Sequence, residues 1–122
     1  MARLSERGSI TLVSGFLSVR PRAGTGLQCA INAALEALGR ALALEHAPVR
    51  VNTVSPGLIA TALWDDMSAQ DRDAMYARAS SRLPVGRVGT AEDVASFILQ
   101  VATNGFATGS TLYLDGGALI AA

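Results

Sequence analysis

Four polar residues at four-residue intervals are the first candidates for chemistry in this sequence. They lie in the stretch GLQCAINAALEALGR and are Gln28, Asn32, Glu36 and Arg40. Residues four apart share one face of a helix, so they would form a stripe. One interpretation is a solvated face, on which Glu36 and Arg40 form an ion pair of about 0.3–0.5 kcal/mol. The alternative is a polar cleft in which Gln28 and Asn32 hydrogen-bond a ligand; amides do not titrate in the useful range, so neither residue can be a general acid or base.

The other reactive side chains do not combine into a site. Cys29 is the only cysteine, and without an evident His or cationic partner it is interpreted as a packing residue. His46 falls at the end of the predicted helix, where a cation interacts favourably with the helix dipole. The acidic cluster lacks the spacing and the His ligand of a metal site; its members are Asp65, Asp66, Asp71 and Asp73. No metal site is predicted.

The hydrophobic pattern predicts the elements that would position these residues. Apolar side chains recur at three- and four-residue steps in the first helix, and Thr90 followed by Asp93 resembles the N-cap of the last one. Alternation of strand and helix gives right-handed crossovers and a parallel sheet with helices on both faces. We therefore predict one α/β domain over residues 1–122. Strands are expected at 9–14, 49–55 and 110–117, long helices at 25–46 and 91–102, and one or two surface helices within 62–83.

Three segments taken together resemble the short-chain dehydrogenase/reductase family. They are GSITLVSG with the following NAALEALGRALALEHAPVRVNTVSPG, then PGLIAT, then LPVGRVGTAEDVASFILQ with TGSTLYLDGG. The match extends over nearly the whole chain but corresponds to the second half of a family member. The resemblance implies a three-layer partial Rossmann fold with family strands five to seven. It also implies that strands one to four are missing, with the Gly-rich turn that approaches the cofactor pyrophosphate.

The resemblance assigns catalysis to a Ser, a Tyr and, four residues after the Tyr, a Lys. In this sequence the Ser position falls on Gly15, the Tyr position on Gln28 and the Lys position on Asn32. Ser14 is a candidate substitute, although adjacent side chains of a strand point to opposite faces. No catalytic residue is therefore assigned.

No other register restores the motif. The chain contains no Lys, and its two tyrosines, Tyr76 and Tyr113, fall in other predicted elements. The resemblance implies an oxidoreductase, and the usual proton relay of that family is absent from the sequence. Whether any turnover remains is left open.

The PGLIAT loop is the part of the implied cofactor site that the sequence keeps. By resemblance, NAD(P) would be contacted by Pro56, Gly57, Ile59 and Thr61, and Trp64 with Met67 would form a flap over the cleft or a partner contact. A site that contacts the nicotinamide but not the pyrophosphate loses most of the affinity for the dinucleotide. Weak or no cofactor binding is expected.

The charge balance and the predicted exposed surface limit which partners are expected. Ten acidic and ten basic residues balance, so no net field favours nucleic acid or an anionic membrane. The N-terminal segment lacks the apolar region of a secretory signal, and one cysteine suits a reducing compartment, which predicts a cytoplasmic protein.

Strand 9–14 would be a sheet edge with Ile10, Leu12 and Val13 open to pairing, and helix 25–46 would expose apolar surface. We expect a homo-oligomer or a complementing chain at these two elements.

Three functions fit these observations. The first is an NAD(P)-linked oxidoreductase with impaired or lost catalysis. The second is a non-catalytic oligomerisation or interaction module that uses the exposed strand and helix. The third is a truncated gene product, because the first Met directly precedes the pattern of the fifth family strand.

Overall fold

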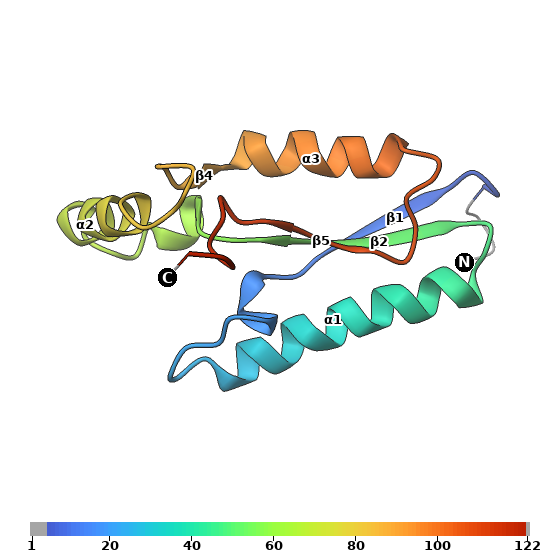
Figure 1. Cartoon of the computed structure of the whole chain (residues 1–122), viewed down its shortest axis with the longest axis horizontal. Helices are drawn as coiled ribbons and strands as arrows, with labels where there is room; N and C mark the ends of the chain where they lie inside the picture. The colour runs from blue at the N-terminus through green and yellow to red at the C-terminus, as the bar shows by residue number, and fades with distance from the viewer. Residues whose placement is uncertain (1–4, 122) are drawn as a thin grey trace.

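The computed structural model describes residues 5–121 and contains a three-stranded parallel sheet between two long helices. Its strands are β1 (Ser9–Val13), β2 (Arg50–Pro56) and β5 (Thr111–Leu114), in the order β1-β2-β5, and the helices are α1 (Gly26–Glu45) and α3 (Ala91–Thr103). Figure 1 shows α1 on one face of the sheet and α3 on the other. The predicted α/β architecture of three parallel strands with helices on both faces is confirmed.

The middle strand forms the core. Val54 of β2 pairs with Val13 of β1 and with Leu112 of β5, and residues 51–55 are all buried. A strand covered on both faces needs no polar alternation, which explains why the run VNTVS is buried throughout. Val101 of α3 and Ala43 of α1 complete the buried apolar set among the described residues.

The two faces of the sheet can be assigned from close contacts. A Cβ added at Gly39 of α1 would lie 2.5 Å from Oγ1 of Thr53 and 3.6 Å from Leu12, so these two side chains point toward α1. Because side chains alternate along a strand, Ser55 shares the α1 face, whereas Val54 lies on the α3 face. The absence of a side chain at Gly39 is what allows α1 to approach the sheet this closely.

Both ends of α3 are capped. At its N-terminus the Thr90 side chain accepts from the Asp93 backbone N–H, and the Asp93 carboxylate accepts from the Thr90 backbone N–H, which makes a capping box. This confirms the predicted N-cap. At the other end the Arg50 guanidinium donates to main-chain carbonyls in the last turn of the helix and just beyond it; they belong to Val101, Ala102, Asn104 and Ala107.

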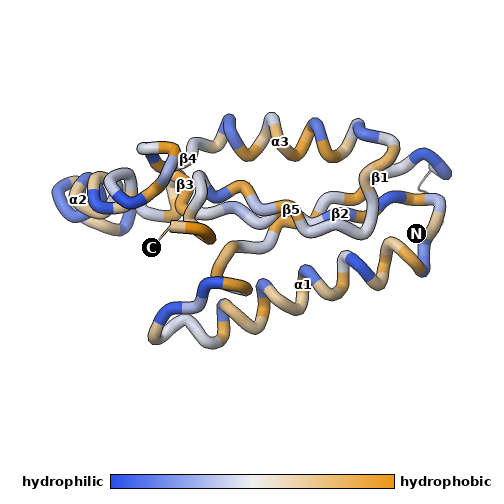
Figure 2. Tube along the Cα trace, viewed as in Figure 1, coloured by the Kyte–Doolittle hydropathy of each residue, from blue (hydrophilic) through white to orange (hydrophobic). Residues whose placement is uncertain are grey.

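Smaller elements gather beyond the carboxyl ends of the strands. They are the 3-10 helices η1 (Phe16–Ser18) and η2 (Ala62–Trp64), the helix α2 (Ala69–Ser80), and the short strands β3 (Ile59–Ala60) and β4 (Gly89–Thr90), which pair in parallel. The β3–β4 pair was not predicted. Figure 2 shows hydrophobic residues recurring along α1 and α3, whereas α2 is richer in hydrophilic ones, as expected for a surface helix.

The expected edges are present, with one correction. Within the described residues β1 pairs only with β2, and Val13 is 50% exposed. Ile10 and Leu12 are only partly exposed, since Leu12 packs near Gly39. No helix in residues 5–121 has the length and apolar character needed to cross a membrane.

Candidate functional site

Two of the three positions that the resemblance assigned to catalysis lie together. A Cβ added at Gly15 would stand 2.9 Å from the Nδ2 atom of Asn32, so the Asn32 amide occupies the space above Gly15. Gln28, one helical turn earlier on α1, is exposed. A glycine and two amides offer hydrogen bonds but no group that can gain or lose a proton near neutral pH.

Glu36 occupies the next turn of α1 and corrects the interpretation of the polar stripe. It is 6% exposed, so this part of the stripe is not a solvated face. The Ser14 hydroxyl donates to Glu36 Oε1 over 3.1 Å, and the Ser18 hydroxyl donates to the same oxygen over 2.5 Å. The ion pair expected between Glu36 and Arg40 does not form; the ion pairs within residues 5–121 are elsewhere.

Ser14 therefore lies on the α1 face. The expectation that it would point away from the Gly15 position was wrong, because both residues lie beyond the last paired residue of β1 and strict alternation ends there. Its hydroxyl is already engaged with Glu36. Ser14 is thus near the family's Ser position, in a hydrogen bond that points into the protein.

Tyr113 of β5 completes the cluster around Glu36. Its hydroxyl donates to Glu36 Oε2 over 3.2 Å. Burial and the neighbouring Glu36 carboxylate raise the pKa of Tyr113 above its usual value of about 10. A tyrosine that serves as a proton donor near neutral pH needs the opposite shift, so this cluster does not replace the missing relay.

The Pro56–Thr61 loop is positioned by close backbone packing. A Cβ added at Gly57 would lie 2.9 Å from the Cα of Asp115, and the Gly57 N–H donates to the Leu114 carbonyl. The Ile59 carbonyl accepts a hydrogen bond of 2.9 Å from the indole N–H of Trp64. Thr61 is exposed. The loop is therefore held against the end of β5, and Trp64 is hydrogen-bonded to it; the predicted flap or partner contact of Trp64 and Met67 stays a prediction.

The resemblance assigns these residues only to the nicotinamide end of the dinucleotide, so the pyrophosphate end needs a site elsewhere. A pyrophosphate is held by backbone N–H groups where a tight turn leads a strand into a helix. In residues 5–121, β1 is separated from α1 by residues 14–25, and β4 leads directly into α3. The first turn of α3 carries Glu92 and Asp93, whose carboxylates would repel a phosphate. The described residues do not form a pyrophosphate site.

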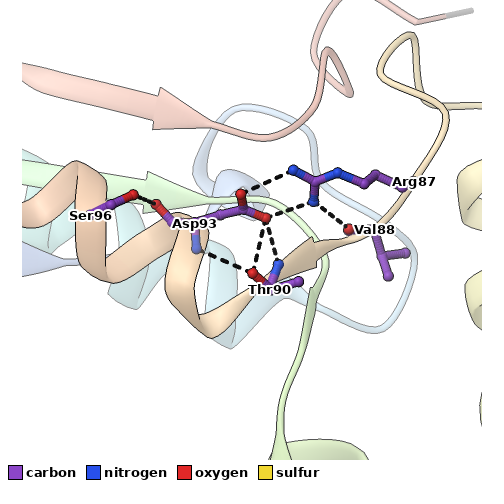
Figure 3. Close-up of polar contacts among 5 residues, drawn as sticks. All are labelled: Arg87, Val88, Thr90, Asp93 and Ser96. Atoms are coloured by element: carbon purple, nitrogen blue, oxygen red, sulfur yellow. Dashed lines mark hydrogen bonds and ion pairs between the residues drawn. The ribbon is translucent and has the colours of Figure 1, made fainter.

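A cavity of about 260 Å³ opens on the other face of the sheet, beside α3. Its wall is mostly apolar and includes Ile59, Phe97 and Leu114. At its polar side the Arg87 guanidinium binds both carboxylate oxygens of Asp93, over 2.6 and 3.0 Å, as Figure 3 shows. These bonds and the Thr90 N–H hold the pKa of Asp93 well below its usual range.

Sequence reasoning found the loop and the capping residues but missed two features. It placed Glu36 in a polar stripe without recognising it as buried, since a position opposite the apolar residues Leu27 and Ile31 on a helix predicts exposure. It did not single out Arg87, whose partner Asp93 lies six residues further along the chain. Both contacts depend on tertiary packing or on a loop, which periodicity does not describe.

Comparisons with known proteins agree with this architecture. The family described as "Enoyl-(Acyl carrier protein) reductase" matches residues 1–118. The chain is 36% identical over 117 residues to short-chain dehydrogenase/reductase ucsE of Acremonium sp, covering 96% of this chain and 44% of that protein. It is 39% identical over 123 residues to an uncharacterized oxidoreductase of Schizosaccharomyces pombe, covering 98% and 47%.

A solved structure is closer in sequence. The crystal structure of a small-chain dehydrogenase in complex with NADPH is 50% identical, superposes with a TM-score of 0.94, and is matched over 98% of this chain and 54% of that one. The chain therefore spans about half the length of the relatives that it matches.

Proposed function

The chain belongs to the short-chain dehydrogenase/reductase family, and from that membership we propose that it is an oxidoreductase-family protein whose catalysis by itself is impaired or lost. The observation that carries the proposal is the contact between Gly15 and Asn32 at the positions of the family's Ser and Lys. A positioned acid or base contributes roughly 10²–10⁴-fold to such reactions, and the residues at these positions supply none.

Cofactor binding is expected to be weak for an independent reason. Pro56, Gly57, Ile59 and Thr61 would contact the nicotinamide end of NAD(P), as the resemblance implies. The described residues provide no counterpart for the pyrophosphate end, where charged contacts contribute strongly to affinity. We propose that the isolated chain binds NADPH and NADH weakly or not at all.

Two measurements on the purified chain test this proposal. Calorimetric titration with NADPH and with NADH is expected to give no saturable binding at micromolar concentrations. A carbonyl-reduction assay at high NADPH is expected to give no turnover above buffer. Micromolar binding together with turnover by the unmodified chain would contradict the proposal.

The matched variant restores the three family residues as Gly15→Ser, Gln28→Tyr and Asn32→Lys. The new Ser has room, since the atom nearest its Cβ is the end of the Asn32 side chain, which the third substitution replaces with a flexible Lys. If the missing relay limits the chain, this variant reduces a carbonyl faster than the unmodified chain at the same NADPH concentration. Equal rates in two active proteins would exclude the relay as the limiting feature.

A second candidate function, an interaction module, is favoured by the exposed face of α1. Leu27 is 76%, Ile31 52% and Leu38 47% exposed, and the spacing of these residues places them in one stripe. With the open edge of β1, this stripe is the surface through which we propose a homo-oligomer or a complementing chain. Contiguous exposed apolar surface of this kind is unusual for a soluble monomer.

Light scattering tests directly whether the chain associates with itself through this surface. The unmodified chain is expected to have a mass above that of one chain, and Ile31→Glu is expected to reduce it to one chain. Leu44→Glu is the matched control, because Leu44 is 85% exposed on α1 but lies outside the stripe. A folded monomer at high concentration would argue against self-association.

A further inference from the structure

The cavity beside α3 is separate from the positions discussed for catalysis. The catalytic positions lie under α1, whereas the cavity lies between α3, the end of β5 and the loop before β4. Figure 1 shows α1 and α3 on opposite faces of the sheet. The cavity shares only Leu58 and Ile59 with the loop Pro56–Thr61. Binding of a ligand in this cavity would therefore not require the family's proton relay.

The charged groups in the cavity wall already have hydrogen-bond partners. Asp93 is held by both guanidinium nitrogens of Arg87 and by the Thr90 N–H, and Figure 3 shows these bonds converging on one carboxylate. Asp115 accepts from the backbone N–H groups of Gly117 and Leu119. A charged ligand would have to displace one of these partners, and it would lose its own hydration as well. The wall therefore selects against an anion, because its one cation among the described residues, Arg87, is already paired with Asp93.

One polar group of the wall remains available. The side-chain amide of Gln100 has no hydrogen-bond partner within residues 5–121, and it is exposed at the cavity. The Ser96 hydroxyl, by contrast, donates to the Asp93 carbonyl on its own helix. An amide can donate and accept at once, so Gln100 can bind a ligand that carries both kinds of group. The other contacts are apolar and come from residues such as Phe97, Leu114 and Leu83.

We propose that this cavity is a binding site for a small, neutral, mainly apolar molecule whose single polar group pairs with Gln100. The volume sets its size. An apolar protein cavity of roughly 150 Å³ is enough to bind benzene, so about 260 Å³ accommodates one ring with a polar substituent. Ligand sites usually combine such an apolar wall with a few polar groups that fix orientation.

Benzamide is the probe, and benzoate is its matched control. The two have nearly the same shape, but only benzoate is charged at neutral pH, and neither has a carbonyl that this family's chemistry would reduce. Titration of the full chain, followed by two-dimensional amide NMR spectra, is expected to show saturable benzamide shifts confined to residues of the cavity wall. Benzoate is expected to bind at least tenfold more weakly, because Arg87 is already paired.

Substitutions at the wall assign the site. Val85 lines the cavity and is 53% exposed, so Val85→Trp is expected to fill the opening and abolish the benzamide shifts. Leu99→Trp is the control, since Leu99 is 64% exposed on α3 and does not line the cavity. Gln100→Met keeps the length of the side chain and is expected to weaken benzamide binding by about three- to tenfold through loss of the hydrogen bonds.

The amide spectra also verify that each variant is folded. The proposal is overturned if benzamide causes no saturable shifts, if the shifts lie outside the cavity wall, or if a folded Val85→Trp binds benzamide as the unmodified chain does. It is also overturned if benzoate binds as tightly as benzamide, because the selection against charge would then be wrong. These results are independent of cofactor binding, so they do not depend on the proposed loss of catalysis.

Discussion

The polar groups on the two faces of the sheet are hydrogen-bonded in different ways. Under α1, the Glu36 carboxylate is buried and accepts three hydroxyl hydrogen bonds, from Ser14, Ser18 and Tyr113. On the α3 face the fully buried Asn52 amide is paired with main-chain groups of Ala107 and Ser110, and the Arg87–Asp93 ion pair stays at the partly exposed rim of the cavity. On the α1 face, hydrogen bonds to Glu36 join four segments of the chain. On the α3 face, a cavity remains unfilled.

The difference supports the proposed loss of catalysis. The α1 face is where the family's proton relay would lie, and in this chain the polar groups there are directed at one another. Function is determined by the site and not by the fold. Within the described residues, the α3 face retains the unpaired Gln100 amide and an unfilled cavity, which together form the proposed binding site.

Removing the carboxylate of Glu36 is expected to have the largest effect on stability. Glu36→Ala leaves the hydroxyls of Ser14, Ser18 and Tyr113 without their acceptor, and hydrogen bonds to a charged group contribute about 1.5–3 kcal/mol each. We expect the free energy of unfolding to fall by about 3 kcal/mol, measured by urea denaturation.

The matched control is Ser55→Ala on the same face. Ser55 is fully buried and its hydroxyl has no hydrogen-bond partner within residues 5–121, so removing that hydroxyl is expected not to lower the free energy of unfolding. If the two substitutions had equal effects, the polar cluster would not be what stabilises the α1 face.

The second prediction concerns the anchoring of α3 at its C-terminal end. Arg50→Met removes one hydrogen-bond donor from each of four main-chain carbonyls and is expected to lower the free energy of unfolding by about 2 kcal/mol. Arg50→Lys keeps the charge but not the planar fork, so it should recover only part of this loss in the same urea experiment. Full recovery by Lys would show that charge alone is sufficient.

The third and smallest effect is a pH dependence at the rim of the cavity. The pKa of Asp93 is lowered in the folded protein, so its stabilising contribution is complete above the usual Asp value of about 4 and is lost as pH falls below it. Asp93→Asn is expected to flatten the decline of the urea midpoint between about pH 5 and pH 3. An unchanged pH profile would mean that the pairing with Arg87 does not persist in solution.

The elements were predictable because they depend on local pattern. Periodic apolar residues indicated α1, and the capping box indicated the start of α3 at Thr90. The β3–β4 pair was missed because each strand has only two residues, too few for a periodic signal. Its pairing also joins segments that are distant in the sequence.

For the site, the sequence could predict only which catalytic residue types are missing. The lack of any Lys and the identities of Gly15, Gln28 and Asn32 can be read directly from the sequence. The burial of Glu36 could not be inferred in this way, because its partners Ser14, Ser18 and Tyr113 come from three other segments. Sequence spacing cannot bring such residues together without the crossover geometry.

The measurement that tests the account most directly is the titration of Tyr113. In a Tyr76→Phe background, Tyr113 is the only tyrosine, so its ionisation can be followed by the near-ultraviolet absorbance of the phenolate. The account predicts a midpoint above the usual value of about 10, which moves down when Glu36→Gln removes the neighbouring charge. A midpoint below 10 would contradict it, because it would show that this face activates a tyrosine as a proton donor.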